Sequence, residues 1–353
     1  MVGLRGVGKT VLLDRMRENS ESTGVQTLRI EAPENRSLPA MLAPELKMAL
    51  LKLSRTERAK DLSNRALRAL AGFVGAFKAK YQDIEVRLDF TPEPGLADNG
   101  DLEHDLQSLL GAAGEAARVG DTALALFLDE MQYVKEEELA ALIIALHRTS
   151  QRGLPVILVG AGLPQLRGRM GRAKSYAERL FTFPEVGPLS DEEAKVAISK
   201  PAGEYGVTVN DDALDLIVAK TRGYPYFLQE WGKHSWDAAL SSPISREDVE
   251  MASRTAVAAL DESFFRVRFD RLTPAERRYL RAMASLGPGT HRSGDIADYL
   301  LRRVTSLGPL RGTLISKGMI WSPQHGDTAF TVPLFDEFMI RMMPGDDWKQ
   351  VPS

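Results

Sequence analysis

The feature that most constrains this chain is a glycine-rich segment near its first residue. Gly3 to Thr10 reads GLRGVGKT and fits the pattern G-x-x-x-x-G-K-[ST]. In this pattern the glycines let the backbone turn round phosphate groups, the lysine reaches their oxygens, and the final hydroxyl binds Mg²⁺. Good helix formers follow Thr10, so the phosphates are expected at a helix N-terminus, where N–H groups favour an anion. The segment predicts a nucleoside triphosphate site.

A second motif is an apolar run that ends in two acids. Ala123 to Leu128 is entirely apolar, which is typical of a buried parallel strand, and Asp129 and Glu130 follow it. At the carboxyl end of such a strand, Asp129 is expected to hold Mg²⁺, while Glu130 orients and polarises the attacking water. A run of this kind alone would more often be a core strand entering a solvated turn. Its pairing with the glycine-rich segment favours the catalytic interpretation.

The wider pattern predicts an α/β fold with a parallel sheet, because apolar strands alternate with amphipathic helices. The predicted strands cover residues 27–30, 123–128, 154–159 and 180–183, and the predicted helices 38–81, 101–118 and 136–152. Only Met1 and Val2 precede Gly3, although a phosphate-binding loop normally follows a buried strand. We therefore expect either an apolar run upstream in the native gene or another segment in that position of the sheet.

The remaining sequence predicts two further domains. Beyond Gly187 the pattern becomes helical, and from about Leu272 it has the order of a winged helix, with helices beginning near Thr273, Ser293 and Thr305 and a hairpin at 318–321 and 329–332. The expected boundaries are 1–187 for the α/β domain, 188–270 for a helical lid and 271–345 for the winged helix. If the third helix of this last module contacts DNA, Arg311 and Lys317 are available. The alternative is that the module packs against the nucleotide domain.

Composition narrows the possible partners. The chain has 353 residues, a formal net charge of -3 and no cysteine, and its five histidines are scattered without ligand spacing. The absence of cysteine excludes disulfides and thiolate metal sites. The small net charge gives no overall electrostatic attraction to nucleic acid or a membrane. No signal peptide or membrane-span pattern is visible, so we expect a cytoplasmic protein.

Together the motifs resemble a prokaryotic AAA+/STAND-type P-loop ATPase of the archaeal-type and origin-recognition-like branch. The resemblance rests on Gly3–Thr10, Asp129-Glu130-Met131-Gln132, Gly162-Leu163-Pro164, Arg179 and Gly223-Tyr224-Pro225. It implies ATP or ADP and Mg²⁺ as ligands, with Thr10 and Asp129 at the metal. It also implies catalytic roles for Glu130, Gln132 and Arg179. The implied nucleotide contacts are Gly3, Arg5, Gly6, Val7, Gly8, Lys9, Thr10, Val11, Tyr224 and Pro225.

Two implications of the resemblance concern how ATP would be used. Relatives place an arginine at the position of Arg179 that touches the γ-phosphate of a neighbouring subunit, which implies a homo-oligomer, with Arg172 as the alternative. Relatives also carry a polar sensor of the γ-phosphate where this chain has Val159-Gly160-Ala161-Gly162. We therefore expect Mg²⁺-dependent ATP hydrolysis that serves a conformational switch and involves an unidentified protein partner. The alternatives are a nucleotide-regulated DNA-binding protein and an inactive P-loop scaffold.

Overall fold

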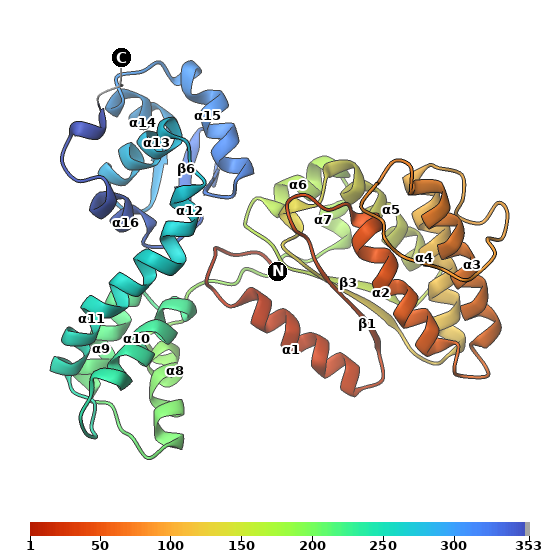
Figure 1. Cartoon of the computed structure of the whole chain (residues 1–353), viewed down its shortest axis with the longest axis horizontal. Helices are drawn as coiled ribbons and strands as arrows, with labels where there is room; N and C mark the ends of the chain where they lie inside the picture. The colour runs from red at the N-terminus through yellow and green to blue at the C-terminus, as the bar shows by residue number, and fades with distance from the viewer. Residues whose placement is uncertain (350–353) are drawn as a thin grey trace. The chain divides into compact units, whose positions relative to one another are not determined.

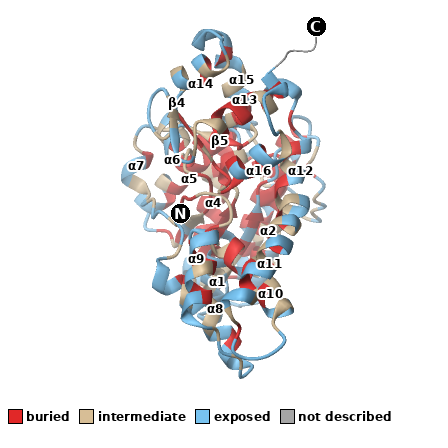
Figure 2. Cartoon of the chain, turned by 90° about the vertical axis from the view of Figure 1, so that its left-hand side faces the viewer, coloured by how far each residue is buried: buried red, intermediate tan, exposed pale blue. Residues whose placement is uncertain are grey.

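The computed structural model describes residues 1–349 and contains two compact units (Figure 1). The first unit comprises residues 1–2 and 9–185, and the second comprises residues 3–8 and the chain from Val186 onward. Each unit has its own hydrophobic core, and Figure 2 colours the buried residues red. Among residues 1–349, no helix is long and apolar enough to cross a membrane.

The first unit is built on a parallel sheet of β1 (Gln26–Glu31), β2 (Leu124–Asp129) and β3 (Val156–Gly160), in that order. All six residues of the central strand β2 are buried, which explains its continuous apolar sequence. The predicted strands at 27–30, 123–128 and 154–159 are thus confirmed. Val2 forms single parallel bridges to Gly162 and Glu185, so the start of the chain lies beside β3.

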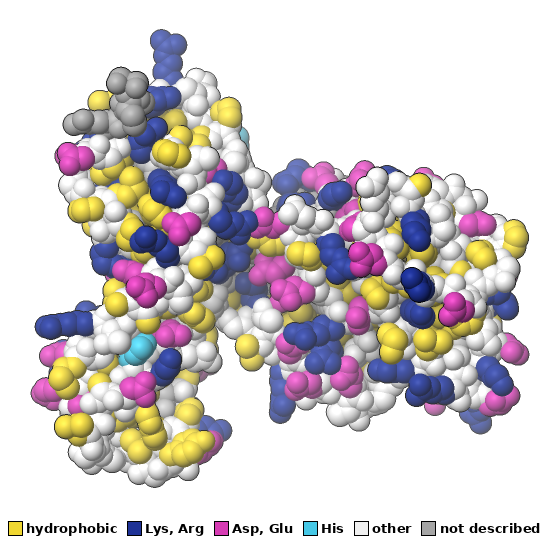
Figure 3. Space-filling view, in the orientation of Figure 1, with side chains coloured by type: hydrophobic (Ala, Val, Ile, Leu, Met, Phe, Trp, Pro, Cys, Tyr) yellow, Lys and Arg dark blue, Asp and Glu magenta, His cyan; other side chains and the backbone are white. Residues whose placement is uncertain are grey.

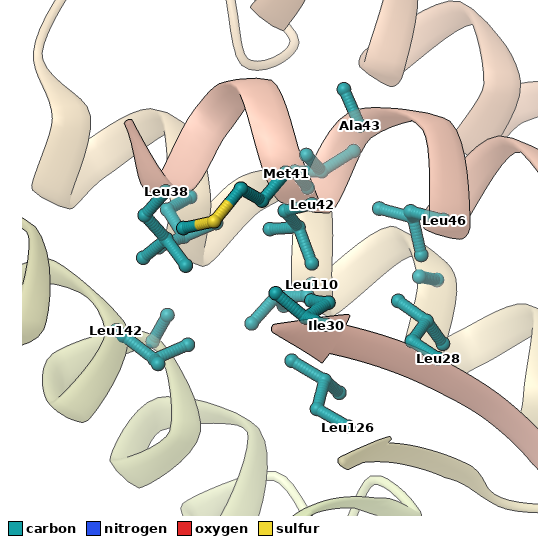
Figure 4. Close-up of a cluster of buried hydrophobic side chains, with 14 of the residues drawn as sticks. Leu28, Ile30, Leu38, Met41, Leu42, Ala43, Leu46, Leu110, Leu126 and Leu142 are labelled. Atoms are coloured by element: carbon teal, nitrogen blue, oxygen red, sulfur yellow. The ribbon is translucent and has the colours of Figure 1, made fainter. Parts of the chain in front are cut away.

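Helices cover both faces of this sheet because its side chains alternate between them. Leu13 of α1 (Lys9–Ser22) packs with Phe127 on one face. On the other face Leu28 and Leu126 meet the side chains of four helices (Figure 4). These helices are α2 (Leu38–Leu53), α3 (Lys60–Phe77), α4 (Leu102–Val119) and α5 (Glu136–Gln151). The N-cap of α4 is the predicted Asp101, whose carboxylate accepts a hydrogen bond from the His104 N–H at 2.8 Å.

Two predicted elements of this unit are wrong. The single helix expected over 38–81 is two helices, α2 and α3, with a turn in which the Thr56 N–H donates to the Leu53 carbonyl at 3.0 Å. One helix of that length would extend for about 66 Å, whereas the turn lets both helices bury their apolar faces in one core. The strand expected at 180–183 is replaced by the end of α7 (Ala177–Leu180) and an irregular segment. Val2 forms one parallel bridge to Glu185, just after this segment. A single bridge is not enough for the hydrogen-bond ladder of a strand.

The second unit begins with a helical region, which we call the lid. It contains α8 (Asp191–Glu204), α9 (Asp211–Thr221), α10 (Pro225–Ala238), α11 (Arg246–Leu260), a π-helical turn η2 (Asp261–Phe265) and α12 (Arg266–Asp270). Serine capping boxes begin α8 and α11.

The last part of the second unit has the element order expected of a winged helix. Its elements are α13 (Pro274–Ser285), β4 (Thr290–Arg292), α14 (Ser293–Tyr299), α15 (Val304–Ser316), β5 (Ile320–Trp321), β6 (Asp327–Phe330) and α16 (Phe335–Met342). The strands form an antiparallel sheet in the order β4-β6-β5. The hairpin forms where it is predicted, with Ile320 paired to Phe330, but its strands have other bounds: β5 begins at Ile320 rather than Gly318, and β6 ends at Phe330 rather than Val332.

Candidate nucleotide site

The two sequence motifs meet in the first unit, at the carboxyl end of β2. Thr10, in the first turn of α1, donates a hydrogen bond from Oγ1 to Asp129 Oδ2 at 2.6 Å across 119 residues of sequence. The other oxygen, Asp129 Oδ1, accepts the Glu130 N–H at 2.7 Å. Asp129 is only 7% exposed, so these bonds fix a buried carboxylate at the start of α1.

The backbone turns sharply directly after Asp129. Glu130 has a φ of 52° and a ψ of 35°, in the left-handed region that side chains other than glycine adopt rarely. A short 3₁₀ helix, η1 (Met131–Tyr133), follows. Strain of this kind is held by the surrounding structure and is common at functional sites. It places Glu130 beside Asp129 but outside the β2 ladder.

Gln132 holds Glu130 in place. Its Nε2 donates to the Glu130 carboxylate, and its Oε1 accepts the Leu163 N–H at 3.0 Å. The side chain is 4% exposed, so both ends of a buried amide are satisfied. The structure thus brings together Thr10, Asp129, Glu130 and Gln132, as the motifs predict.

The same contacts explain why no polar side chain stands at the end of β3. A Cβ on Gly160 would lie 2.1 Å from Met131 Sδ, and one on Gly162 would lie 2.9 Å from Gln132 Oε1. The two glycines therefore make room for the side chains of η1. Here Gln132 supplies the polar amide next to the segment where relatives carry their sensor.

Two residues near this site were missed by the sequence analysis. Arg169 of α6 (Leu166–Ala173) donates to the carbonyls of Gln132 at 2.5 Å and Val134 at 2.7 Å. Burial, together with the charge of Arg172, lowers the pKa of Arg169. These two hydrogen bonds hold η1 in place. No motif in the sequence indicates this role for Arg169.

Glu31 is the second missed residue. It ends β1 directly opposite Asp129 in the parallel register, and both line a cavity of about 20 Å³ beside Thr10. A space of this size holds about one water molecule. The signal that could have found Glu31 is its position as an acid directly after the predicted strand at 27–30.

These residues fit a Mg²⁺ ion held jointly with phosphates. Magnesium is usually bound by one or two carboxylates, water and substrate phosphate oxygens rather than by a cage of protein ligands. Thr10 and Asp129 would hold it, and no group of three or more His, Cys, Asp or Glu residues suited to a metal occurs within residues 1–349. When bound, the ion would neutralise charge on the β- and γ-phosphates.

The glycine-rich loop from Gly3 to Gly8 has its contacts in the second unit. The Arg5 N–H donates to the Thr331 carbonyl at 3.1 Å, and the Tyr226 N–H donates to the Gly6 carbonyl at 3.1 Å. Gly6 and Gly8 have φ values of 81° and 86°, which a glycine adopts without strain. Among the other residues of the motif, Val7 and Lys9 are buried and Val11 is 72% exposed.

The Gly223-Tyr224-Pro225 segment forms the start of α10. Pro225 is its first residue, Tyr224 is its N-cap, and Gly223 has a φ of 71°. A Cβ on Gly223 would lie 2.3 Å from the Leu189 carbonyl oxygen, so only glycine fits. Burial raises the pKa of Tyr224. Within the second unit, this segment adjoins the glycine-rich loop through Tyr226.

The two candidate arginines of α6 and α7 differ in their contacts. Arg172 lies 3.8 Å from Glu136 in an exposed ion pair. Arg179 is exposed, and its guanidinium makes no hydrogen bond or ion pair with the part of the chain that the structure describes. The structure does not bring Arg179 to Glu130.

Two family models match this chain. Residues 1–159 match the model described as AAA ATPase domain. Residues 262–339 match a domain of unknown function, DUF8462. No curated protein matches the chain.

Solved structures are similar to this chain at low sequence identity. The Walker-type ATPase PABY2304 of Pyrococcus abyssi is similar, with a TM-score of 0.57 and 18% identity over 96% of this chain and 89% of that chain. The ORC2 protein of Aeropyrum pernix, in ADPNP-ADP complexes, has a TM-score of 0.49 and 17% identity over 98% of this chain and 87% of that chain. The predicted resemblance to archaeal-type AAA+ ATPases and the P-loop α/β fold are confirmed.

Proposed function

We propose that this AAA ATPase domain binds Mg²⁺-ATP and hydrolyses it to ADP and phosphate. The observation that carries the proposal is the 2.6 Å hydrogen bond between Thr10 and Asp129. Two motifs recognised independently in the sequence supply the two side chains expected to share the metal, and the fold brings them into contact. Lys9 follows the glycine-rich loop at the start of α1, where it reaches the phosphates.

Glu130 is the proposed base that positions the attacking water. Its carboxylate accepts a hydrogen bond from Gln132, which orients it and leaves other lone pairs of the two oxygens for the water. The segment Val159 to Gly162 supplies no polar side chain as a γ-phosphate sensor. This lack supports slow hydrolysis coupled to a conformational switch rather than rapid motor activity.

Arg179 is the proposed contact to the γ-phosphate of a neighbouring copy. Its exposed and unpaired guanidinium on α7 is available to another subunit, whereas Arg172 already faces Glu136. A site completed in this way makes turnover per subunit rise with protein concentration. The partner that uses the switch is not identified by any of these contacts.

Arg311 in α15 and Lys317 directly after it offer little support to the DNA-binding alternative. Arg311 donates to Thr328 Oγ1 at 2.9 Å and to the Asp327 carbonyl at 2.7 Å, and Lys317 pairs with Glu276 at 2.8 Å. Both side chains serve the internal structure of their module. A test for duplex binding is better placed at the exposed Arg302 and Arg303.

Steady-state ATP turnover with Mg²⁺, measured over a range of protein concentrations, tests the proposal. Glu130→Gln should lower kcat by about 10²- to 10⁴-fold, the usual contribution of a general base, and should retain ATP binding. The exposed Glu137→Gln is the matched control and should keep wild-type turnover. Equal, negligible turnover of the wild type and Glu130→Gln despite ATP binding would overturn hydrolysis. Absence of ATP binding would favour the inactive scaffold.

A further inference from the structure

A cavity of about 490 Å³ lies in the lid, apart from every residue of the nucleotide site named above. It is lined by α8, α9 and α10, by Val209 between α8 and α9, and by Ile244 between α10 and α11, and it is open to the surface. Its volume falls within the range of about 300–1,000 Å³ that is usual for small-molecule pockets. Hydrophobic side chains gather on the surface at the α8 end of the lid (Figures 1 and 3).

The walls of the cavity are mostly aliphatic and aromatic. Ile198 of α8, Ile217 of α9 and Leu228 of α10 line it. At the rim, Tyr205 and Trp236 form an edge-to-face pair with ring centroids 6.1 Å apart, and these rings are 79% and 42% exposed. Large exposed aromatic groups beside a cavity are typical of binding sites.

The floor of the cavity is held by backbone hydrogen bonds. The Ile244 N–H donates to the Thr208 carbonyl at 2.8 Å, and the Asn210 N–H donates to the Ile244 carbonyl at 3.0 Å. Ile244 and Val209, which form this bridge, both line the cavity. A Cβ on Gly232 of α10 would lie 3.0 Å from Ile198 Cδ1, so a larger residue there would crowd the wall. The cavity therefore has a defined shape.

The polar side chains of the lining come from α10, except for Tyr205 at the end of α8. Ser235 is 1% exposed, and its Oγ makes no hydrogen bond in the structure. A serine inside a helix ordinarily satisfies its hydroxyl on the carbonyl four residues earlier. A buried hydroxyl without a partner costs about 1–3 kcal/mol, which a ligand atom could recover.

The charge of the lining favours an anion. Lys233 is the only charged residue among those that line the cavity, and no carboxylate is among them. Lys233 is exposed and forms no ion pair with residues 1–349, unlike Lys195 of α8, whose ammonium lies 2.6 Å from Asp215. Gln229, one helical turn before Lys233, adds an amide to the same side.

We propose that the lid cavity binds a small amphipathic molecule with an apolar body and one anionic head group, of the class of medium-chain carboxylates. The apolar body packs among Ile198, Ile217 and Leu228, and the head group meets Lys233. This site is independent of ATP, so its test does not depend on the proposed hydrolysis.

The test is calorimetric titration of the full chain with decanoate, decanol and decyltrimethylammonium. Decanoate should bind saturably and most tightly of the three. Shorter carboxylates should bind more weakly, by about threefold to fourfold for each methylene removed. Lys233→Gln should weaken decanoate binding at least fivefold and leave decanol binding unchanged. Lys200→Gln, at an exposed lysine of α8 outside the lining, is the matched control and should bind decanoate as the wild type does.

A second variant tests the cavity itself. Ala197→Phe, at an exposed lining position of α8, should block the cavity and abolish decanoate binding while circular dichroism shows an unchanged unfolding transition. Decanoate binding that persists in Ala197→Phe would overturn the location. Equal binding of decanol and decanoate, or a preference for the cation, would overturn the anionic head group. No saturable binding, with self-association that Ala197→Phe disrupts, would assign the cavity to a second copy of the chain.

Discussion

Two buried carboxylates, one in each unit, have hydrogen-bond donors of different charge. Asp129 in the first unit accepts from neutral donors, the Thr10 hydroxyl and the Glu130 N–H. Glu276 in the second unit accepts from the Lys317 ammonium at 2.8 Å and from the Thr273 N–H at 2.7 Å. Neutral donors orient a carboxylate without cancelling its charge, whereas an ammonium neutralises it. The comparison indicates that the Asp129 carboxylate keeps a charge that a bound cation could use. The charge of Glu276 is instead neutralised by Lys317 and stabilises its own module.

The largest expected effect is a loss of stability when the Lys317 ammonium is removed from Glu276. Lys317→Met leaves the Glu276 carboxylate, which is 2% exposed, without its charged donor. We expect the free energy of unfolding to fall by about 3 kcal/mol, the loss that follows when one partner of a buried pair is removed. Urea denaturation followed by circular dichroism measures it. The matched variant is Asp129→Asn, which keeps one of the two acceptor oxygens and should lower stability by about 1 kcal/mol, less than Lys317→Met. Equal destabilisation by both variants would break the comparison.

A smaller effect is expected at Arg311, a basic residue of α15 with internal contacts. Arg311→Met removes hydrogen bonds to Thr328, Ser322 and the Asp327 carbonyl. Because each such bond contributes about 1 kcal/mol net and part of the site is exposed, we expect a loss of about 2 kcal/mol. Thermal unfolding against the exposed Arg302→Met as control measures it. Unchanged stability combined with weaker duplex binding would reassign Arg311 to DNA recognition.

The smallest expected effect on stability comes from a change of pH, which alters the protonation of Glu276. Burial would raise the pKa of Glu276, but the hydrogen bonds from Lys317 and Thr273 and the Lys317 charge outweigh it and lower that pKa. Its contribution to stability is therefore present above the unfolded-state pKa, near 4.5, and is lost as pH falls through the lowered folded-state value.

A buried glutamate of α5 should respond in the opposite sense. Burial raises the pKa of Glu138 despite hydrogen bonds from the Leu38 and Lys135 N–H groups and the Lys135 charge. Its contribution is present below the unfolded-state pKa and is lost as pH rises through the raised folded-state value. Amide hydrogen exchange at pH 7 and pH 4, corrected for intrinsic rates, should therefore show acid weakening α13 more than α5. Equal weakening of α13 in wild type and Glu276→Gln would contradict this account.

The sequence predicted the site where the chemistry depends on residue type and spacing. Thr10 and Asp129 were selected because the glycine-rich loop and the apolar strand ending in acids occur together in one chain, whereas the strand alone would more often be a core strand entering a turn. Arg169 was missed because its role depends on the carbonyls of η1, and no pattern in the sequence shows where those carbonyls point.

The errors in the fold prediction have a similar origin. The break at 54–59 contains no glycine or proline, so it has no strong local signal. The apolar residues at 180–183 look like a strand, but strand formation requires a neighbour with which to pair, and Val2 provides one bridge. The internal use of Arg311 and Lys317 likewise depends on residues that lie elsewhere in the sequence.

The central claim is that Thr10 and Asp129 share a Mg²⁺ ion with bound ATP, and a double-mutant cycle tests it most directly. ATP affinity would be measured by calorimetry with and without Mg²⁺ for the wild type, Thr10→Val, Asp129→Asn and the double variant. We predict that Mg²⁺ tightens ATP binding to the wild type, that each single variant loses most of this gain, and that the double variant loses little more. ATP affinity independent of Mg²⁺ in the wild type, or additive losses in the double variant, would contradict the shared site.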